Sequence, residues 1–315
     1  MNSFWDELPK PFFVLAPMEA VTDVIFRHVI KRAATPDLFF TEFTNATGWA
    51  HAGEPAIGGR LVKTEDEKPM IAHLWGADPE AMVKLAAHAR DLGYDGLDLN
   101  TGCPDKSAVR SGGGAGLIKT PELAAEMIKA MKTAGLPVSV KCRLGYSKLD
   151  EFEDWISFLL SQDITALTVH LRTKKEMSKV DAHWEVMPRI VELRNEIAPR
   201  TLLIGNGDVR DRQHGLDLIK QTGIDGVMIG RGVFHNPFAF GRQPEQHSKK
   251  ELLDLLRLQL DLYDQYSPLT RRPFDTLKRF FKIYVRDFDG AAELRDKLMH
   301  TKTTDEVRHI LVSVN

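Results

Sequence analysis

The sequence is poor in cysteine and contains no long hydrophobic run. Its 315 residues include two cysteines, Cys103 and Cys142, which excludes a small disulfide-stapled fold and suits a reducing compartment. The N-terminal MNSFWDELPK lacks a basic start followed by an apolar run, and no apolar stretch approaches the ~20 residues that span a bilayer. We therefore expect a cytoplasmic protein with no signal peptide and no membrane association.

A strong charge of either sign is also absent. The formal net charge is -2, which excludes a protein that is basic over its whole surface. A local basic stripe on such a chain can still bind nucleic acid phosphates. The content of 43% hydrophobic and 27% charged residues is ordinary for a globular chain, and the length leaves room for a large core.

Short apolar runs alternate with helical stretches over the first three quarters of the chain. Eight such strand-then-helix units predict a (β/α)8 TIM barrel, with an open doubly wound sheet as the alternative. The expected strands are Phe13–Ala16, Leu38–Glu42, Met70–Trp75, Gly96–Asn100, Val138–Arg143, Ala166–Leu171, Leu202–Asn206 and Gly226–Ile229, and two clear helices are Pro79–Leu92 and Pro121–Ala134.

The pattern changes after Phe240. The polar segment Gly241–Lys250 reads as a linker, and only helical signals follow it. The expected helices are Glu251–Tyr266, Phe274–Phe288, Ala291–His300 and Thr304–Ser313. We therefore predict a catalytic barrel over residues 1–243 and a small all-helical domain over residues 244–315.

Polar side chains gather where the expected strands end, which is where barrel enzymes place their active sites. On the fifth strand, Lys141 and Arg143 share one face and Cys142 takes the other. His170 and Arg172 are likewise two residues apart. A buried Lys141 is costly unless an anion compensates it, so the alternation indicates an anionic ligand at the barrel mouth.

The glycine-rich ends of the last two strands predict a phosphate site. Backbone N–H groups of Gly205–Asp208 and Gly230–Gly232 are suited to surround a phosphate. The run Ser111–Thr120 is not a P-loop, because Ile118 stands where glycine is required before the lysine, and we expect it to form a flexible active-site loop carrying Cys103. No G-x-G-x-x-G opens a helix, so no Rossmann site for a nicotinamide cofactor is expected, and no metal ligand is assigned.

Six motifs occur in a fixed order along the expected barrel. They are Ala16-Pro17-Met18, Asp98-Leu99-Asn100-Thr101-Gly102-Cys103-Pro104, Val140-Lys141-Cys142-Arg143-Leu144-Gly145, His170-Leu171-Arg172-Thr173, Asn206-Gly207-Asp208 and Gly230-Arg231-Gly232. Together they resemble the tRNA-dihydrouridine synthase family over about residues 12 to 240, and the helical tail is similar to that family's tRNA-binding domain.

The resemblance implies an FMN prosthetic group, tRNA as substrate and partner, and roles for particular residues. Cys103 would be the general acid, and Asn100 and Arg172 would hold the flipped uracil. The flavin would be bound by Pro17, Met18, His73, Lys141 and His170, and its phosphate by Asn206, Gly207, Asp208, Gly230 and Arg231.

Three positions depart from the family pattern. His73 stands where glutamine is usual, which affects a flavin contact. Leu171 replaces a small residue between His170 and Arg172 and is expected to narrow the pocket. Asp105 follows the Cys-Pro pair where a small residue is common, and is expected to shift the pKa of Cys103.

The implied mechanism is a hydride transfer followed by a proton transfer. NADPH, or NADH, would reduce FMN, the flavin would give hydride to C6 of uracil, and Cys103 would protonate C5. A thiol suits the acid role because its ordinary pKa of about 8.5 keeps it protonated at neutral pH. The target uridine must leave its stack, which favours loosely held loop nucleotides.

The tail contributes a candidate RNA-binding stripe. If Phe274–Phe288 is one helix, Lys278, Lys282 and Arg286 lie along one face, with Arg279 beside them. The opposite face carries Leu277, Phe281, Tyr284 and Phe288. We expect the basic face to contact tRNA phosphates, with an affinity that falls steeply with salt.

Two alternative functions stay open from the sequence. One is an FMN barrel enzyme of the dihydroorotate or dihydropyrimidine dehydrogenase kind, acting on a free pyrimidine. The other is a flavin-free RNA-binding module that retains the barrel. No feature requires an obligate protein partner, and a monomer is expected.

Overall fold

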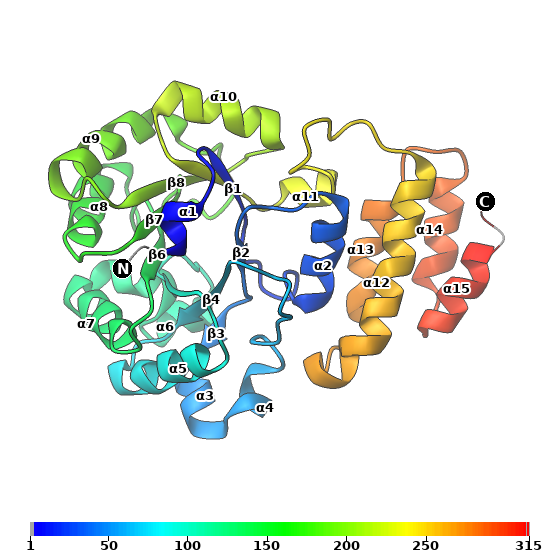
Figure 1. Ribbon diagram of the computed structural model, residues 1–315, viewed down its shortest axis with the longest axis horizontal. Coiled ribbons are helices and arrows are strands. Elements are labelled where there is room, and N and C mark those ends of the chain that lie inside the picture. The colour runs from blue at the N-terminus through cyan, green and yellow to red at the C-terminus, as the bar shows by residue number, and fades with distance from the viewer. Residues whose placement is uncertain (1–2, 313, 315) are drawn as a thin grey trace.

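The computed structural model describes residues 3–312 and 314 and confirms the predicted (β/α)8 barrel followed by a helical C-terminal segment (Figure 1). The barrel strands are β1 (Phe12–Leu15), β2 (Phe39–Phe40), β4 (Met70–Trp75), β5 (Gly96–Asn100), β6 (Val138–Arg143), β7 (Ala166–His170), β8 (Leu202–Asn206) and β9 (Gly226–Ile229), and β3 (Thr44–Asn45) pairs with β4.

The sheet closes on itself, which excludes the open doubly wound alternative. Its order is β1-β9-β8-β7-β6-β5-β4-β2, and every pairing is parallel. The gap between β2 and β1 is bridged where Val14 pairs with Leu38 and Leu15 N–H donates to the Leu38 carbonyl at 3.2 Å.

Helices surround the strands in the expected alternation. In the barrel these are α2 (Val24–Ala33), α3 (Ala46–Ala52), α4 (Glu54–Ile57), α5 (Pro79–Asp91), α6 (Lys106–Arg110), α7 (Pro121–Lys132), α8 (Phe152–Leu160), α9 (Met187–Ile197), α10 (Arg212–Thr222) and α11 (Gly232–His235), with short 3-10 turns η1 (Gly114–Lys119), η2 (Leu149–Glu151) and η3 (Trp184–Val186). Several of these helices begin at a side chain that caps them: Asp78, for example, accepts the N–H groups of Glu80 and Ala81 at the start of α5.

Strand alternation divides the core into two parts. Phe12 and Val14 point inward to a small apolar cluster in the lower part of the barrel, at the end where the strands begin. Helix α1 (Phe4–Glu7) supplies Trp5 to this cluster. Phe13 and Leu15 point outward into the large layer between strands and helices. The apolar filling of the lower barrel leaves the polar inward residues at the upper, carboxyl ends of the strands.

The C-terminal segment packs beside α2 and is continuous with the outer core (Figure 1). It comprises α12 (Lys249–Thr270), α13 (Asp275–Tyr284), α14 (Ala291–Met299) and α15 (Thr304–Val312). The predicted helix Phe274–Phe288 is wrong at its C-terminal end, because Val285 leaves helical geometry at φ -101°, ψ 80°. Among the described residues, no helix has the length and apolar character needed to cross a membrane.

Candidate active site

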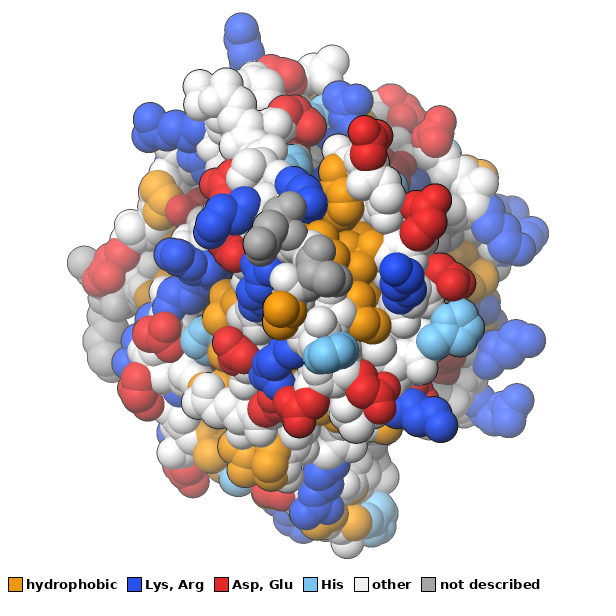
Figure 2. All heavy atoms as spheres, turned by 90° about the vertical axis from the view of Figure 1, so that its right-hand side faces the viewer, with side chains coloured by type: hydrophobic (Ala, Val, Ile, Leu, Met, Phe, Trp, Pro, Cys, Tyr) orange, Lys and Arg blue, Asp and Glu red, His pale blue; other side chains and the backbone are white. Residues whose placement is uncertain are grey.

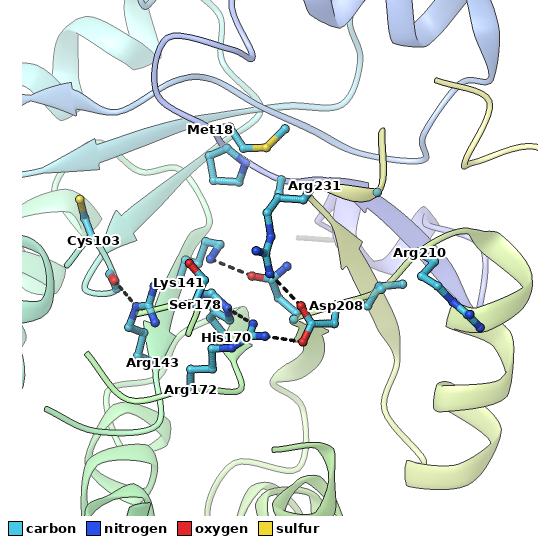
Figure 3. A pocket seen from close by; sticks show the side chains of 18 of the residues that line it. Met18, Cys103, Lys141, Arg143, His170, Arg172, Ser178, Asp208, Arg210 and Arg231 are labelled. Atoms are coloured by element: carbon cyan, nitrogen blue, oxygen red, sulfur yellow. Dashed lines mark hydrogen bonds and ion pairs between the residues drawn. The ribbon is translucent and has the colours of Figure 1, made fainter. Parts of the chain in front are cut away.

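A cavity of about 920 Å³ opens at the carboxyl ends of the barrel strands (Figure 3). Figure 3 shows Cys103 at one end of it and Arg210 at the other, with a group of cationic side chains between them. The lining includes Pro17, Met18, His73, Asn100, Cys103, Lys141, Arg143, His170, Arg172, Asn206, Gly207, Asp208, Gly230 and Arg231. The structure thus brings together every barrel residue that the sequence assigned to the site.

Cys103 lies on a turn that is fixed from several sides. The side-chain oxygen of Asn100 accepts the N–H groups of Gly102 and Cys103, at 3.0 and 2.9 Å. Arg143 Nε donates to the Gly102 carbonyl at 2.7 Å, and Ala115 N–H donates to the Cys103 carbonyl at 2.9 Å. Burial raises the pKa of the Cys103 thiol, a shift that a hydrogen bond from the Asp105 backbone opposes. The thiol is therefore protonated at neutral pH.

The predicted flexible loop over Ser111–Thr120 is wrong. Residues 113–117 are buried, and η1 occupies the second half of the run. Gly114 has φ +54°, and a Cβ there would lie 2.8 Å from the Cys103 carbonyl oxygen. The glycines therefore allow close packing of the chain behind Cys103.

Asp105 has a structural task that the sequence did not reveal. Its carboxylate accepts the N–H groups of Ser107 and Ala108, at 2.8 and 3.4 Å, and so begins α6. Its negative charge is a minor influence that raises the pKa of Cys103 further.

Lys141 and His170 form the centre of the cavity. Lys141 Nζ donates to the side-chain oxygen of Asn206 at 3.2 Å, and burial together with the nearby Arg143 lowers its pKa to about 8. Burial and the charges of Lys141, Arg143 and Arg172 hold the pKa of His170 well below its ordinary value. His170 is therefore neutral, and the cluster carries positive charge that an anion would compensate.

Arg172 has three protein partners. It is buried, and its Nε donates to the Val180 carbonyl at 2.6 Å. Its Nη1 lies 3.1 Å from His170 Nε2, and its Nη2 pairs with Asp208. Because arginine only donates, His170 Nε2 must accept. Arg172 is thus held as an organiser of the site, and its predicted contact with uracil stays a prediction.

The glycine-rich strand ends form the third region of the cavity. Gly207 adopts φ +130°, and a Cβ there would lie 2.7 Å from that of Ala182, so only glycine fits. The Asp208 carboxylate is paired with Arg231 at 2.8 Å as well as with Arg172. An anion at this end would meet the Arg231 guanidinium and the backbone N–H groups.

His73 is held by a buried hydrogen-bonded chain that sequence reasoning missed. Its Nδ1 lies 2.6 Å from Asp98 Oδ2, and Ser139 Oγ donates to the other Asp98 oxygen at 2.6 Å. Asp98 shares a strand face with Asn100, and Ser139 with Lys141, so strand alternation was the available signal. Burial lowers the pKa of His73 despite the Asp98 carboxylate.

Comparison with known families identifies the chain. A family model described as "Dihydrouridine synthase (Dus)" matches residues 14–314. The chain belongs to the dihydrouridine synthase family. It is 58% identical over 311 residues to the "Probable tRNA-dihydrouridine synthase 2" of Bacillus subtilis (strain 168), covering 98% of this chain and 96% of that protein. It is 56% identical to the "Probable tRNA-dihydrouridine synthase" of Staphylococcus aureus (strain COL), with 98% and 95% covered.

Two solved structures share the fold of this dihydrouridine synthase family member. The complex of 2-naphthoyl-CoA reductase with 2-naphthoyl-CoA has a TM-score of 0.52 and 9% identity, covering 74% of this chain and 49% of that one. The 6-hydroxypseudooxynicotine amine oxidase from Pseudomonas geniculata N1 has a TM-score of 0.52 and 11% identity, covering 79% and 47%. The chain spans about half of each, and the likeness concerns the fold alone.

In this family member the predicted basic stripe on α13 is shorter than expected. Lys278 is paired with Asp275 at 2.7 Å, and Lys282 is exposed. Arg279 donates to the Ala20 carbonyl at 3.0 Å, which brings α13 to the rim of the barrel mouth. Arg286 lies beyond the end of α13 and is partly buried, so its place on the stripe was wrong.

The outer end of the helical segment is not uniformly basic. Figure 2 faces this end and shows Lys and Arg side chains mixed with Asp and Glu around a strip of hydrophobic side chains. Such mixed charge gives little net attraction for a polyanion. The α13 side that approaches the barrel mouth is therefore the better candidate for RNA.

Proposed function

We propose that this chain is an FMN-dependent tRNA-dihydrouridine synthase. It reduces the C5–C6 double bond of uridines in tRNA with NADPH or NADH, and Cys103 donates the proton. The family membership and the names of the relatives from Bacillus and Staphylococcus support the reaction and the tRNA substrate. The observation that carries the proposal is a protonated thiol on a rigid turn at the edge of a cation-rich barrel mouth.

The residues present fit an anionic flavin nucleotide. The buried side-chain N–H2 group of Asn100 has no acceptor within residues 3–312 and 314, which indicates that the cavity holds a ligand beside the flavin, while the Asn100 oxygen accepts two backbone N–H groups. Lys141 is held at a cost that a nearby negative charge would offset. We assign the ring end to Pro17, Met18, His73, Lys141 and His170, and the phosphate end to Asn206, Gly207, Asp208, Gly230 and Arg231.

When bound, reduced FMN supplies a hydride for C6 of uracil. The protein contributes position and the proton: the Cys103 S–H bond breaks as a C–H bond forms at C5. Asn100 holds the Cys103 turn through its oxygen and has its N–H2 group free for a uracil oxygen. A positioned acid of this kind contributes about 10²–10⁴-fold in rate.

Arg172 and Arg143 act by holding the loops around the cavity. Arg143 joins the Gly102 carbonyl to those of Thr173 and Met177, and Arg172 holds that of Val180. We keep Arg172 as a substrate-binding candidate, since two of its five N–H donors have no protein acceptor in the described residues. We assign tRNA binding to residues 244–315, through Lys278, Arg279 and Lys282 of α13, and catalysis to residues 1–243.

A spectroscopic experiment tests the proposal. The purified protein should show a flavin spectrum that NADPH bleaches and that unmodified tRNA restores in the absence of oxygen. Cys103→Ala should retain the flavin and the bleaching but lose restoration by tRNA. Cys142→Ala is the matched control, because Cys142 points into the outer core, away from the cavity.

Each contrary result has a defined meaning. Normal restoration in Cys103→Ala removes Cys103 from the mechanism. Restoration by free uracil or orotate, and not by tRNA, would indicate a free-pyrimidine enzyme. A colourless protein that binds tRNA tightly would indicate an RNA-binding module.

A further inference from the structure

A second cavity of about 250 Å³ adjoins the main one at Cys103. It shares Phe43 and Cys103 with the main cavity, and its remaining walls come from the β1–α2 loop, the α3–α4 region, the end of β4 and α6. Its lining is Glu19, Phe43, Asn45, Ala56, Ile57, Arg60, Trp75, Cys103, Asp105, Ser107 and Ala108. The reaction proposed above uses only its Cys103 edge.

The walls of the second cavity suit a flat, uncharged group. Phe43 and Trp75 are aromatic and only partly buried. The Arg60 guanidinium is neutralised by Glu19, with Nε to Oε1 at 3.0 Å, and also donates to the Ile57 carbonyl at 2.7 Å. Because its cation is already paired, the cavity offers little attraction for a phosphate.

Two residues that line this cavity also carry side-chain N–H donors without a protein acceptor in the part of the chain that the structure describes. The indole N–H of Trp75 and the side-chain N–H2 of Asn45 have no acceptor among the described residues, whereas the Asn45 oxygen caps α3 through Gly48 N–H. Gly113 packs closely against the Trp75 ring, since a Cβ on Gly113 would lie 3.0 Å from it. Aromatic side chains with N–H donors near them are the groups that recognise an unstacked base in RNA.

The lining of the second cavity extends from Cys103 to Glu19, which is next to the loop residue that α13 contacts. Arg279 of α13 donates to the carbonyl of Ala20, which adjoins Glu19 on the cavity wall. Glu19 in turn accepts the N–H of Phe43 at 3.3 Å. For a strand of RNA that contacts α13 at this loop and places one nucleotide in the main cavity, the second cavity is therefore an adjacent site for a neighbouring nucleotide.

We propose that the second cavity binds the base of a nucleotide directly next to the target uridine, stacked on Trp75. This inference rests on the proposed tRNA substrate and extends it to a neighbouring nucleotide. It makes Trp75 a substrate-binding residue that acts on tRNA and not on the flavin. The volume of about 250 Å³, below the ~300–1,000 Å³ of sites for drug-sized ligands, suits a single base.

The test combines changes in the enzyme with changes in the RNA. The uridine that the wild-type enzyme reduces in an unmodified tRNA transcript is located by mass spectrometry, and transcripts with an abasic site on either side of it are prepared. With wild-type enzyme, one of the two should lower kcat/KM by about 5- to 150-fold, the range expected for one stacked base. Trp75→Leu should lower kcat/KM for the intact transcript similarly and show little further loss with that abasic transcript.

A second enzyme variant guards against a folding defect. Ala56 is exposed on α4 and lines the second cavity, so Ala56→Trp should fill the cavity without disturbing Trp75 and should also abolish the abasic effect. Phe158→Leu is the matched control: it replaces an aromatic side chain with leucine on α8, away from the barrel mouth, and should behave as wild type. Flavin content and bleaching by NADPH should be unchanged in all three variants.

The outcomes separate this inference from the proposed function. If wild-type enzyme reduces no uridine in tRNA, the proposed function itself is wrong. If it reduces tRNA but tolerates both abasic sites, or if Trp75→Leu and Ala56→Trp keep the full abasic loss, the second cavity does not bind a neighbouring base.

Discussion

Lys141 carries a positive charge into a cavity that already contains other cations. Burial and the neighbouring Arg143 lower its pKa from 10.5 to about 8, and its hydrogen-bond acceptor in the described part of the chain is the neutral Asn206 side chain. Asp98 acts in the opposite direction but is already bonded to His73 and Ser139. The flavin-free protein therefore holds Lys141 at a cost in free energy of unfolding.

This cost predicts how the stability of the flavin-free protein depends on pH. The folded pKa of Lys141 lies below the unfolded one, so between about pH 8 and 10.5 the unfolded state keeps a proton that the folded state has lost. Raising the pH through this window should stabilise the wild type relative to Lys141→Met, by roughly 3 kcal/mol at most. Urea unfolding of both flavin-free proteins across this range measures the difference, and parallel curves would contradict the assignment.

Residue-level prediction succeeded where strand alternation decides the outcome. It placed Lys141 and Arg143 at the cavity and Cys142 in the outer core, as observed. It failed to find the Asp98 partner of His73 and the three partners of Arg172, since these contacts depend on how separate strands and loops meet in space.

The helix α13 connects the tail to the barrel mouth. Its inner face is apolar and buried, and Arg279 reaches the Ala20 carbonyl on the β1–α2 loop. Lys282 is exposed, while Lys278 is partly covered and paired with Asp275. The free basic groups on this helix are therefore fewer than the sequence predicted.

We expect Arg279 and Lys282 to carry most of the phosphate contact of α13. The double variant Arg279→Gln/Lys282→Gln should weaken tRNA binding and reduce the slope of log K against log salt concentration by about 2, since each lost phosphate contact removes about 1. Lys129→Gln/Lys220→Gln removes the same charge from α7 and α10 and should leave the slope unchanged. An unaltered slope in the first variant, measured by filter binding over a salt series, would rule out this interface.

Strands with a regular apolar pattern were predictable from the sequence. Short elements and the end of helix α13 were not. Strands β4, β5, β6, β8 and β9 have the predicted bounds. The strands β8 and β9 are nearly continuous apolar runs, whereas β4, β5 and β6 alternate outward apolar residues with inward residues that include polar ones. The two-residue β3 and the short α3 and α4 had no periodic signal, although β3 and α4 supply Asn45, Ala56 and Ile57 to the second cavity. The end of α13 at Tyr284 was missed because apolar spacing continues to Phe288 after the helical geometry has stopped.

The molecule as a whole has one outer core that runs from the barrel into the C-terminal helices. Phe280 of α13 packs against Phe26 of α2, with ring centroids 4.8 Å apart, and against Phe234 at 6.2 Å. Arg272 adds an ion pair to the buried Glu42 at the end of β2, at 2.7 Å. The division into residues 1–243 and 244–315 stays a prediction, and from the shared packing we expect the two parts to unfold together.

A substitution in the helical part should therefore destabilise the barrel. Phe280→Ala removes a side chain that is 4% exposed, with an expected loss of about 3–5 kcal/mol in free energy of unfolding. All five tryptophans (Trp5, Trp49, Trp75, Trp155 and Trp184) lie in the barrel, so tryptophan fluorescence reports on that part alone. If the parts unfold together, fluorescence and circular dichroism should show the same lowered Tm in Phe280→Ala, and the exposed Leu269→Ala should leave both near the wild-type value. A fluorescence transition that stays at the wild-type temperature while circular dichroism shows an earlier step would instead establish two independently stable domains.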